Sequence, residues 1–94
     1  MIIISFEFYI ERETGIRHID RHDVGIEEIQ EFFNDSVFYE KQREDESFVA
    51  YGKVKSGRSL KVVYRKKSKY LYFIITAHDL EDKMIIQFLD EEIE

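Results

Sequence analysis

The chain of 94 residues has no cysteine, only three histidines and no apolar run long enough to cross a bilayer. Without disulfides, its small core has to be stabilised by close packing, by cross-strand pairs or by association with another chain. The same absence favours a cytoplasmic location, since disulfides mark oxidising compartments. The opening stretch MIIISFEFYI has no basic leader and acquires a charge at Glu7, which predicts a strand and neither a signal peptide nor a membrane span. We therefore expect no membrane association.

Internal repeats, linkers and low-complexity segments are also missing, and the length suits one hydrophobic core. With 44% hydrophobic and 15% aromatic residues, the chain has enough apolar side chains to fold. We therefore predict a single domain over residues 1–94. No bound cofactor is expected.

Charge is unevenly distributed along the chain. The formal net charge is −6, yet residues 53–69 carry eight basic side chains and no acidic one, while all twenty acidic residues lie elsewhere. A sequence pI of about 5.1 argues against a general affinity for nucleic acid, whereas a segregated basic hairpin can still bind anions locally. The alternative is an ordinary lysine-protected edge or a solvated strand face.

Hydrophobic periodicity predicts an α+β fold with a four- or five-stranded antiparallel sheet. Strands are expected over residues 2–10, 36–42, 47–54, 59–65 and 70–77, and the last is nearly all apolar, which suggests the central strand. An amphipathic helix is predicted over residues 25–34, with Gly25 as its N-cap and Glu28 at the third helical position. Residues 11–24 are polar and can hold a short helical turn or a loop.

A C-terminal helix is predicted over residues 79–92, with Asp79 as its N-cap. Its apolar residues cover a sector much wider than a surface helix needs. Either the helix lies between the sheet and a partner, or its end is frayed and those residues are incidental. We favour a second contact surface, because the apolar patch would otherwise face water. The expected partner-interface residues are Met84, Ile86, Leu89 and Ile93.

The stretch RHIDRHDV, residues 17–24, holds two of the three histidines. On a helix, His18 and His22 would share a face at i,i+4 spacing and could supply two zinc ligands. No second cluster of Cys or His exists to complete such a site except His78, so we predict no metal. We interpret the segment as the lead-in to the first helix, with His18 incidental.

Three longer stretches, RHDVGIEEIQEFFND, YGKVKSGRSLKVVYR and YFIITAHDL, resemble the BrnT-type toxin family of bacterial type II toxin-antitoxin systems. That family runs from a Phe-Glu strand through a Lys-His-Gly-Val segment to a helix that opens with two glutamates, then through a Gly-Arg turn to a strand ending in Ile-Ser-Ala-Arg. The matching elements here are Phe6-Glu7, Arg21-His22-Asp23-Val24, Glu27-Glu28, Gly52, Gly57-Arg58 with Leu60, and Ile75-Thr76-Ala77-His78. A related family of uncharacterised bacterial domains is similar as well.

The resemblance implies a RelE-like fold and a toxin-type endoribonuclease that an antitoxin neutralises. Metal-free RNA cleavage needs a base, an acid and a cation that stabilises the phosphorane. Arg58 is the cation candidate, because the Gly-Arg motif maps onto it and a guanidinium binds phosphate bidentately. His22 and His78 are the candidates for proton transfer, since imidazole titrates near neutrality. The alternative for both histidines is a local hydrogen-bonding or packing role.

The basic hairpin supplies the remaining candidates. Strand alternation puts Lys61 and Arg65 on one side of the strand over residues 59–65, opposite its core side, and we add Lys61 to the catalytic set. The expected RNA- or phosphate-binding residues are Lys53, Lys55, Arg65 and Lys66. Charge reversal at Arg58 and Lys61 is expected to abolish growth inhibition and to leave the fold intact. An antitoxin would cover this hairpin with an acidic segment.

The tyrosines of the predicted strands have two readings. Tyr51, Tyr64, Tyr70 and Tyr72 could stack on bases, but aromatic residues on strands usually pack in the core, and we favour core for most of them.

Two departures from the family pattern support a competing hypothesis. The family's arginine after Ile-Ser-Ala is His78 here, and the C-terminal helix carries five acidic residues around a single Lys83. RNA approaching that end would be repelled. These features favour a non-catalytic interaction module that homodimerises through the C-terminal helix. A homo-oligomer or a hetero-complex is expected under either hypothesis.

Overall fold

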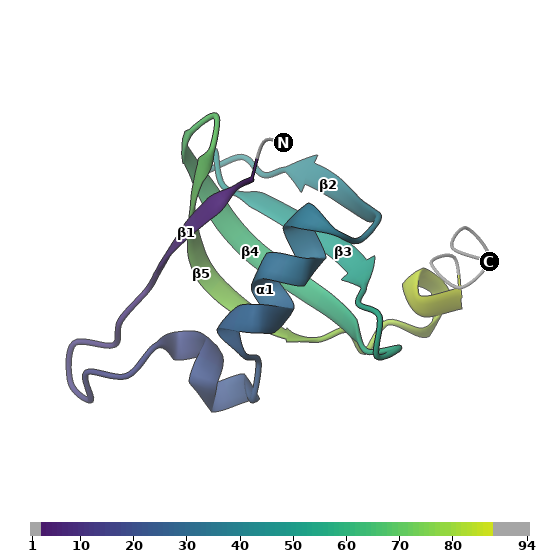
Figure 1. The fold of residues 1–94 in the computed structure, drawn as a ribbon, viewed down its shortest axis with the longest axis horizontal. Coiled ribbons are helices and arrows are strands. Elements are labelled where there is room, and N and C mark those ends of the chain that lie inside the picture. Colours follow the sequence, from purple (N-terminus) through teal and green to yellow (C-terminus); the bar gives the residue numbers. More distant parts are fainter. Residues whose placement is uncertain (1–2, 88–94) are drawn as a thin grey trace.

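The computed structural model describes residues 3–87 as an α+β domain with one five-stranded sheet. The elements follow one another along the chain as β1 (Ser5–Phe8), the 3₁₀-helix η1 (His18–His22), α1 (Ile26–Asn34), β2 (Phe38–Gln42), β3 (Phe48–Lys53), β4 (Ser59–Ser68) and β5 (Leu71–Asp79) (Figure 1). Residues 83–87 are helical as well. Within the described residues, no helix combines the length and the apolar character that crossing a membrane requires.

The strands lie in the order β1-β5-β4-β3-β2. Strands β2 to β5 form the predicted antiparallel meander, but β1 pairs with β5 in parallel, so the fully antiparallel sheet expected from the sequence is wrong at this edge. A parallel neighbour needs a crossover connection, which η1 and α1 provide between β1 and the meander. The middle strand is β4, and β5 lies beside it rather than at the centre.

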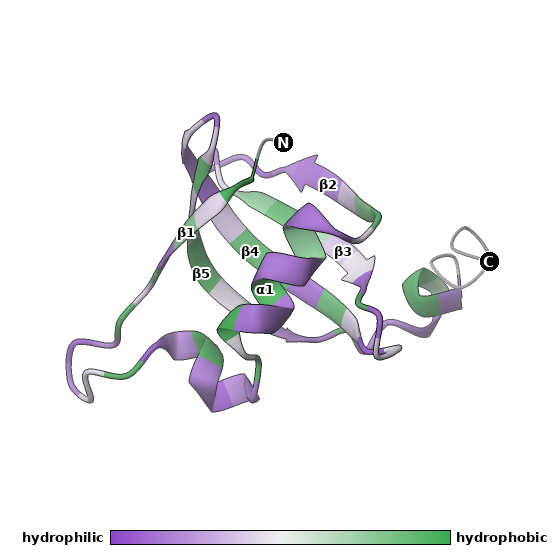
Figure 2. Cartoon of the chain, viewed as in Figure 1, coloured by the Kyte–Doolittle hydropathy of each residue, from purple (hydrophilic) through white to green (hydrophobic). Residues whose placement is uncertain are grey.

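Helix α1 lies across one face of the sheet and confirms the helix predicted from periodicity (Figure 1). Ile29, Phe32 and Phe33 are buried against the sheet, while the hydrophilic side of the helix faces away from it (Figure 2). Gly25 is the N-cap, and its backbone N–H donates a hydrogen bond to the Glu28 carboxylate at 3.1 Å. This contact satisfies one of the amides that a helix start leaves without an intrahelical partner.

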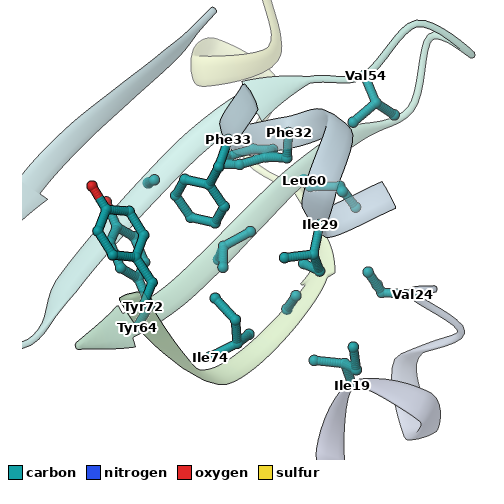
Figure 3. Close-up of a cluster of buried hydrophobic side chains, with 13 residues drawn as sticks. Ile19, Val24, Ile29, Phe32, Phe33, Val54, Leu60, Tyr64, Tyr72 and Ile74 are labelled. Carbon is teal, nitrogen blue, oxygen red and sulfur yellow. The ribbon is translucent and has the colours of Figure 1, made fainter. Parts of the chain in front are cut away.

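The core fills the space between α1 and the sheet (Figure 3). Tyr64 and Tyr72 belong to it, as the sequence suggested, and the hydroxyl of Tyr64 donates a hydrogen bond to the Glu40 carboxylate at the rim of the core. Because burial and this carboxylate both disfavour the phenolate, the pKa of Tyr64 is raised well above its ordinary value.

The interface between α1 and the sheet depends on one glycine. An added Cβ at Gly52 of β3 would lie 2.7 Å from the Phe32 ring and 3.0 Å from the Cβ of Phe38. Those distances are shorter than van der Waals contact, so only glycine lets the two aromatic side chains pack this closely over β3.

The C-terminal helix begins later than its sequence pattern predicts. Asp79 is not its N-cap but the last residue of β5, and the backbone N–H of Leu80 still donates to the Ser59 carbonyl at 2.9 Å. Asp82 caps the helix instead, because its carboxylate accepts hydrogen bonds from the backbone N–H groups of Met84 and Ile85. Pairing with β4 therefore makes Asp79 part of a strand, although the local capping pattern assigned it to the helix. Residues 88–92 of the predicted helix, and with them Leu89, lie outside the described residues, as does Ile93.

Candidate functional site

The outer face of the sheet is the face that α1 does not cover. Buried residues such as Val62 and Ala77 point towards α1, so the side chains that alternate with them point outwards. The register pairs Tyr51 of β3 with Lys61 of β4, and Lys61 with His78 of β5. These three residues therefore form a row across three adjacent strands.

Helix η1 adds a second histidine to the end of this row. The ring of His22 lies 5.5 Å from that of His78, measured between ring centroids. Its position is fixed because Ile19 and Val24, on either side of it in the chain, are both about 1% exposed and belong to the core. Burial of these two apolar side chains thus holds an exposed segment against the end of β5.

A pocket of about 490 Å³ opens where η1, the three strands and the C-terminal helical turn meet. It is lined by His22, Tyr51, Lys61, His78, Asp79, Leu80, Glu81, Asp82 and Ile85. Three of the four catalytic candidates chosen from the sequence, His22, Lys61 and His78, thus share one pocket. They come from positions up to 56 residues apart in the chain.

The two pocket histidines differ in their surroundings. The Nδ1 of His78 lies 2.9 Å from the backbone carbonyl of Asp79, and because a carbonyl only accepts, Nδ1 carries the proton and Nε2 remains available. The pKa of His22 is lowered from its ordinary value of 6.5 by burial first, and then by the charges of His18 and His78. His22 is therefore neutral at neutral pH and able to accept a proton.

Arg58, the fourth catalytic candidate, is held by internal partners and does not line the pocket. Its Nε donates to the Asp79 carboxylate at 2.5 Å, and its Nη1 donates to the Glu28 carboxylate at 2.9 and 3.1 Å. Two more bonds run to backbone carbonyls, from Nη1 to Asp23 at 2.8 Å and from Nη2 to His22 at 3.2 Å. Arg58 thus joins the β3–β4 turn to the start of α1 and the end of η1.

This arginine also sets the charge state of its partner beside the pocket. The hydrogen bond from Arg58 lowers the pKa of Asp79 below its ordinary value, with the coulombic attraction acting in the same direction, and the pKa of Arg58 is raised in return. Asp79 therefore stays a carboxylate at any pH near neutrality. Its charge is balanced by Arg58 and is not left to oppose an anion in the pocket.

The third histidine extends the row away from the pocket. The ring of His18 lies 5.2 Å from that of His22, and its Nδ1 is 3.1 Å from the Glu11 carboxylate. Arg21 donates to the same carboxylate, and chiefly for this reason the pKa of Glu11 falls to about 2. His18 is therefore part of a polar contact that fastens η1 to the segment after β1, and it was not predicted to have any role.

The described residues contain no group of three or more His, Cys, Asp or Glu side chains arranged to hold a metal ion. The rings of His18 and His78 each pack against the ring of His22, at 5.2 and 5.5 Å between centroids.

The candidate phosphate-binding residues are spread over the hairpin. Lys53 and Arg65 lie on the outer face, and Arg65 hydrogen-bonds the backbone carbonyl of Asp45 at 2.9 Å. Lys55 is exposed in the β3–β4 turn. Lys66 lies on the α1 side, where its ammonium group bonds Glu40 at 2.8 Å and sits 4.3 Å from the centroid of the Phe48 ring. Lys53 and Arg65 are thus the members of this set that share a face with the pocket.

Tyr51 was named from the sequence as a possible base-stacking residue, although core packing was favoured for most of the four tyrosines. Alternation with the buried Ala50 and Gly52 places it on the outer face. Other pocket residues were missed in the sequence. Glu81 and Ile85 had no distinguishing signal, because they reach the pocket only when β5 extends to residue 79. Of the predicted partner-interface residues, Met84 is 82% exposed and Ile86 is partly buried.

No protein-family model, no curated protein and no solved structure matches the chain. The pocket is thus the feature of the molecule that indicates a function.

Proposed function

We propose that this domain is a metal-independent endoribonuclease whose active site is the pocket of His22, Lys61 and His78. The observation that supports the proposal is the convergence of two imidazoles and one ammonium group, from η1, β5 and β4, at one pocket. An acid, a base and a cation at one place are the groups that cleavage of an RNA phosphodiester requires.

In this proposal the 2′-hydroxyl of the substrate attacks the adjacent phosphorus. Neutral His22 takes the hydroxyl proton as the O2′–P bond forms, and protonated His78 gives a proton from Nε2 to the 5′-oxygen as the P–O5′ bond breaks. Lys61 stabilises the negative charge that develops on the phosphorane oxygens. The products are a 2′,3′-cyclic phosphate and a 5′-hydroxyl, and exchange with water returns the two histidines to their starting states.

Arg58 acts as a positioning residue in this scheme. It bonds the backbone carbonyl of His22 and the side chain of Asp79, the residue next to His78 in the chain. One guanidinium therefore holds the backbone beside both imidazoles. The cation that meets the substrate is Lys61, for which the described residues provide no ion-pair partner.

We further propose that the domain is RelE-like and related to the BrnT-type toxins, and that it acts in the cytoplasm under the control of an antitoxin. Four antiparallel strands after a helix, and the meeting of the motif residues His22, Glu28, Arg58 and His78 at one end of the sheet, support this relationship. An acidic antitoxin segment over β3 and β4 would cover Lys53, Lys61 and Arg65 and close the pocket.

The experiment is a cleavage assay on a purified single-stranded RNA in the presence of a chelator. His22→Gln and His78→Gln should each lower the rate by about 100-fold or more, as expected for loss of a general acid or base. Lys61→Met should lower it as well. His18→Gln should lower it less than the pocket variants do, since His18 contacts the ring of His22 but does not line the pocket. Lys69→Met is the matched control for lysine, since Lys69 lies in the β4–β5 turn.

Two results would contradict the proposal. A parent protein that leaves the RNA intact would exclude the activity on this substrate class, provided that circular dichroism shows the protein to be folded. Equal losses in the pocket variants and in the control variants would show that the activity comes from elsewhere.

The exposure of Met84 favours a second candidate function, a non-catalytic module that homodimerises through the C-terminal segment. At 82% exposed, Met84 is the most exposed large hydrophobic side chain within residues 3–87. If this surface pairs two copies, light scattering should give the mass of a dimer and Met84→Glu should convert it to a monomer. A monomer mass for the parent over a broad concentration range would count against it.

A further inference from the structure

The row that contains two of the pocket residues continues beyond the pocket. In the register of the sheet, Tyr39 of β2 pairs with Tyr51 of β3, and Tyr51 pairs with Lys61, which pairs with His78. All four residues belong to the outer face by strand alternation. Two aromatic rings therefore lie in line with the proposed reacting groups, on the side of the pocket opposite His22.

Spacing makes this row long enough for a nucleotide strand. Neighbouring strands lie about 4.8 Å apart, so Tyr39 and His78 are separated by roughly 14 Å across three strand intervals. That distance is several times the rise of about 3.4 Å between stacked bases. Bases on either side of a phosphate at the pocket can therefore reach the two rings.

A second hollow continues the pocket along the same face. It has a volume of about 580 Å³ and is lined by Lys41, Gln42, Arg43, Glu44, Asp45, Val49 and Tyr51. Tyr51 belongs to the walls of both hollows. The carboxylate of Asp45 already accepts two hydrogen bonds from Ser47, so it is engaged locally, while Lys41 and Arg43 supply positive charge.

The charge of the outer face matches an anion. Its strand residues include the cations Lys41, Lys53, Lys61, Arg65 and Lys67. The acidic residue on these outward strand positions is Glu7 of β1, which is neutralised by Lys67 at 2.6 Å on the far side of the sheet. The outward strand positions around Tyr39 and Tyr51 are thus basic and aromatic, which is the combination that binds single-stranded nucleic acid. The acidic side chains nearby, Glu44 and Asp45, belong to the β2–β3 turn.

We propose that Tyr51 and Tyr39 form a stacking platform that binds unpaired bases of single-stranded RNA next to the reacting phosphate. This inference rests on the proposed function and names its substrate class. Tyr51 stacks on the base nearest the pocket and Tyr39 on the next one, while Lys41 and Lys53 lie on either side of the row and face the phosphates. Bases inside a duplex are stacked on each other and cannot reach the rings, so the platform selects single strands.

The test measures binding apart from cleavage. The probe is a short, unstructured, fluorescein-labelled RNA whose 2′-hydroxyls are all methylated, which prevents the attack step, and binding is followed by fluorescence anisotropy. Tyr51→Leu keeps the apolar bulk on β3 but removes the ring, and should weaken binding roughly 5- to 100-fold. Tyr39→Leu should also weaken it, whereas Tyr51→Phe should bind like the parent because stacking does not need the hydroxyl. A duplex of the same sequence should bind more weakly than the single strand.

Tyr70→Leu is the matched control. Tyr70 is 42% exposed in the β4–β5 turn, at the end of β5 opposite His78, so its loss should leave binding unchanged. The platform is refuted if the parent does not bind the probe, or if Tyr51→Leu binds it as tightly as the parent does. Cleavage of unmodified RNA is measured in parallel. If Tyr51→Leu weakens binding but the parent does not cleave RNA, the platform is supported and the nuclease is refuted. If the parent cleaves RNA but Tyr51→Leu binds the probe as tightly as the parent, the nuclease is supported and the platform is refuted.

Discussion

Replacing Arg58 should lower the free energy of unfolding, because this side chain connects three elements through hydrogen bonds. Arg58→Met retains an unbranched apolar stem but removes every donor. The variant loses the bonds to Glu28, to Asp79 and to the carbonyls of His22 and Asp23. Glu28 keeps only its contact with the Gly25 amide.

The magnitude follows from the exposure of each partner. The side chains of Arg58 and Glu28 are 24% and 30% exposed, so their pair is largely shielded from water, whereas Asp79 is 60% exposed and its pair contributes at most about 1 kcal/mol. Adding the shielded pair and two neutral carbonyl acceptors, we expect the free energy of unfolding to fall by about 2–4 kcal/mol. For a domain of this size that corresponds to a Tm lower by roughly 10–30 °C.

Urea unfolding followed by circular dichroism measures this change, and Arg65→Met is the matched control. Arg65 lies on the same hairpin, is 47% exposed and bonds one carbonyl and one distant carboxylate, so its loss should cost less than about 1 kcal/mol. If Arg58→Met lowers the stability no more than Arg65→Met does, the clamp described for Arg58 is wrong. For the same reason, reversing the charge at Arg58 should destabilise the fold, contrary to the expectation from the sequence. Of the two residues chosen for charge reversal, only Lys61 can therefore test the chemistry.

Four further predictions follow from single residues. Gly52→Ala should lower the free energy of unfolding by about 1–3 kcal/mol, measured in urea, because its Cβ would overlap the Phe32 ring and the Cβ of Phe38. Glu46 has a φ of 69°, so Glu46→Gly should raise the stability by up to about 1 kcal/mol in the same assay. The pKa of Glu11 is lowered from 4.5 to about 2, so the ionised carboxylate stabilises the fold above pH 4.5 and this stabilisation is lost as the pH falls towards 2. Glu11→Gln should therefore remove the loss of stability between pH 4.5 and pH 2, measured by acid unfolding. The lowered pKa of His22 should place the acidic limb of kcat/KM for RNA cleavage below pH 6.5, and an acidic limb above that value would contradict the role of His22 as the base.

Local patterns were sufficient for much of the fold. Helix α1 was predicted within one residue, since Gly25, Glu28 and the apolar spacing all lie within a few residues of one another. The same kind of local signal failed at Asp79, where pairing with β4 decides the conformation. The parallel partner of β1 was also missed, because periodicity identifies a strand and its buried side but not its neighbours.

Residue type and order were enough to nominate part of the site but not to explain it. His22, Lys61 and His78 were chosen as groups that can transfer protons or stabilise charge, and the structure brings them to one pocket. Arg58 was chosen in the same way, yet its partners are residues 22, 23, 28 and 79, which no spacing rule connects with it. Tyr51 could have been placed on the outer face by alternation alone, since its neighbours in β3 are buried.

The most direct test of the proposed activity uses an oligonucleotide with a single ribonucleotide in an otherwise DNA strand, incubated with the parent protein and a chelator. We predict cleavage only after the ribonucleotide, giving one product with a 2′,3′-cyclic phosphate and one with a 5′-hydroxyl, both identified by mass spectrometry, and no cleavage by His22→Gln. An intact oligonucleotide, or products that carry a 3′-hydroxyl and a 5′-phosphate, would contradict the role assigned to His22, Lys61 and His78.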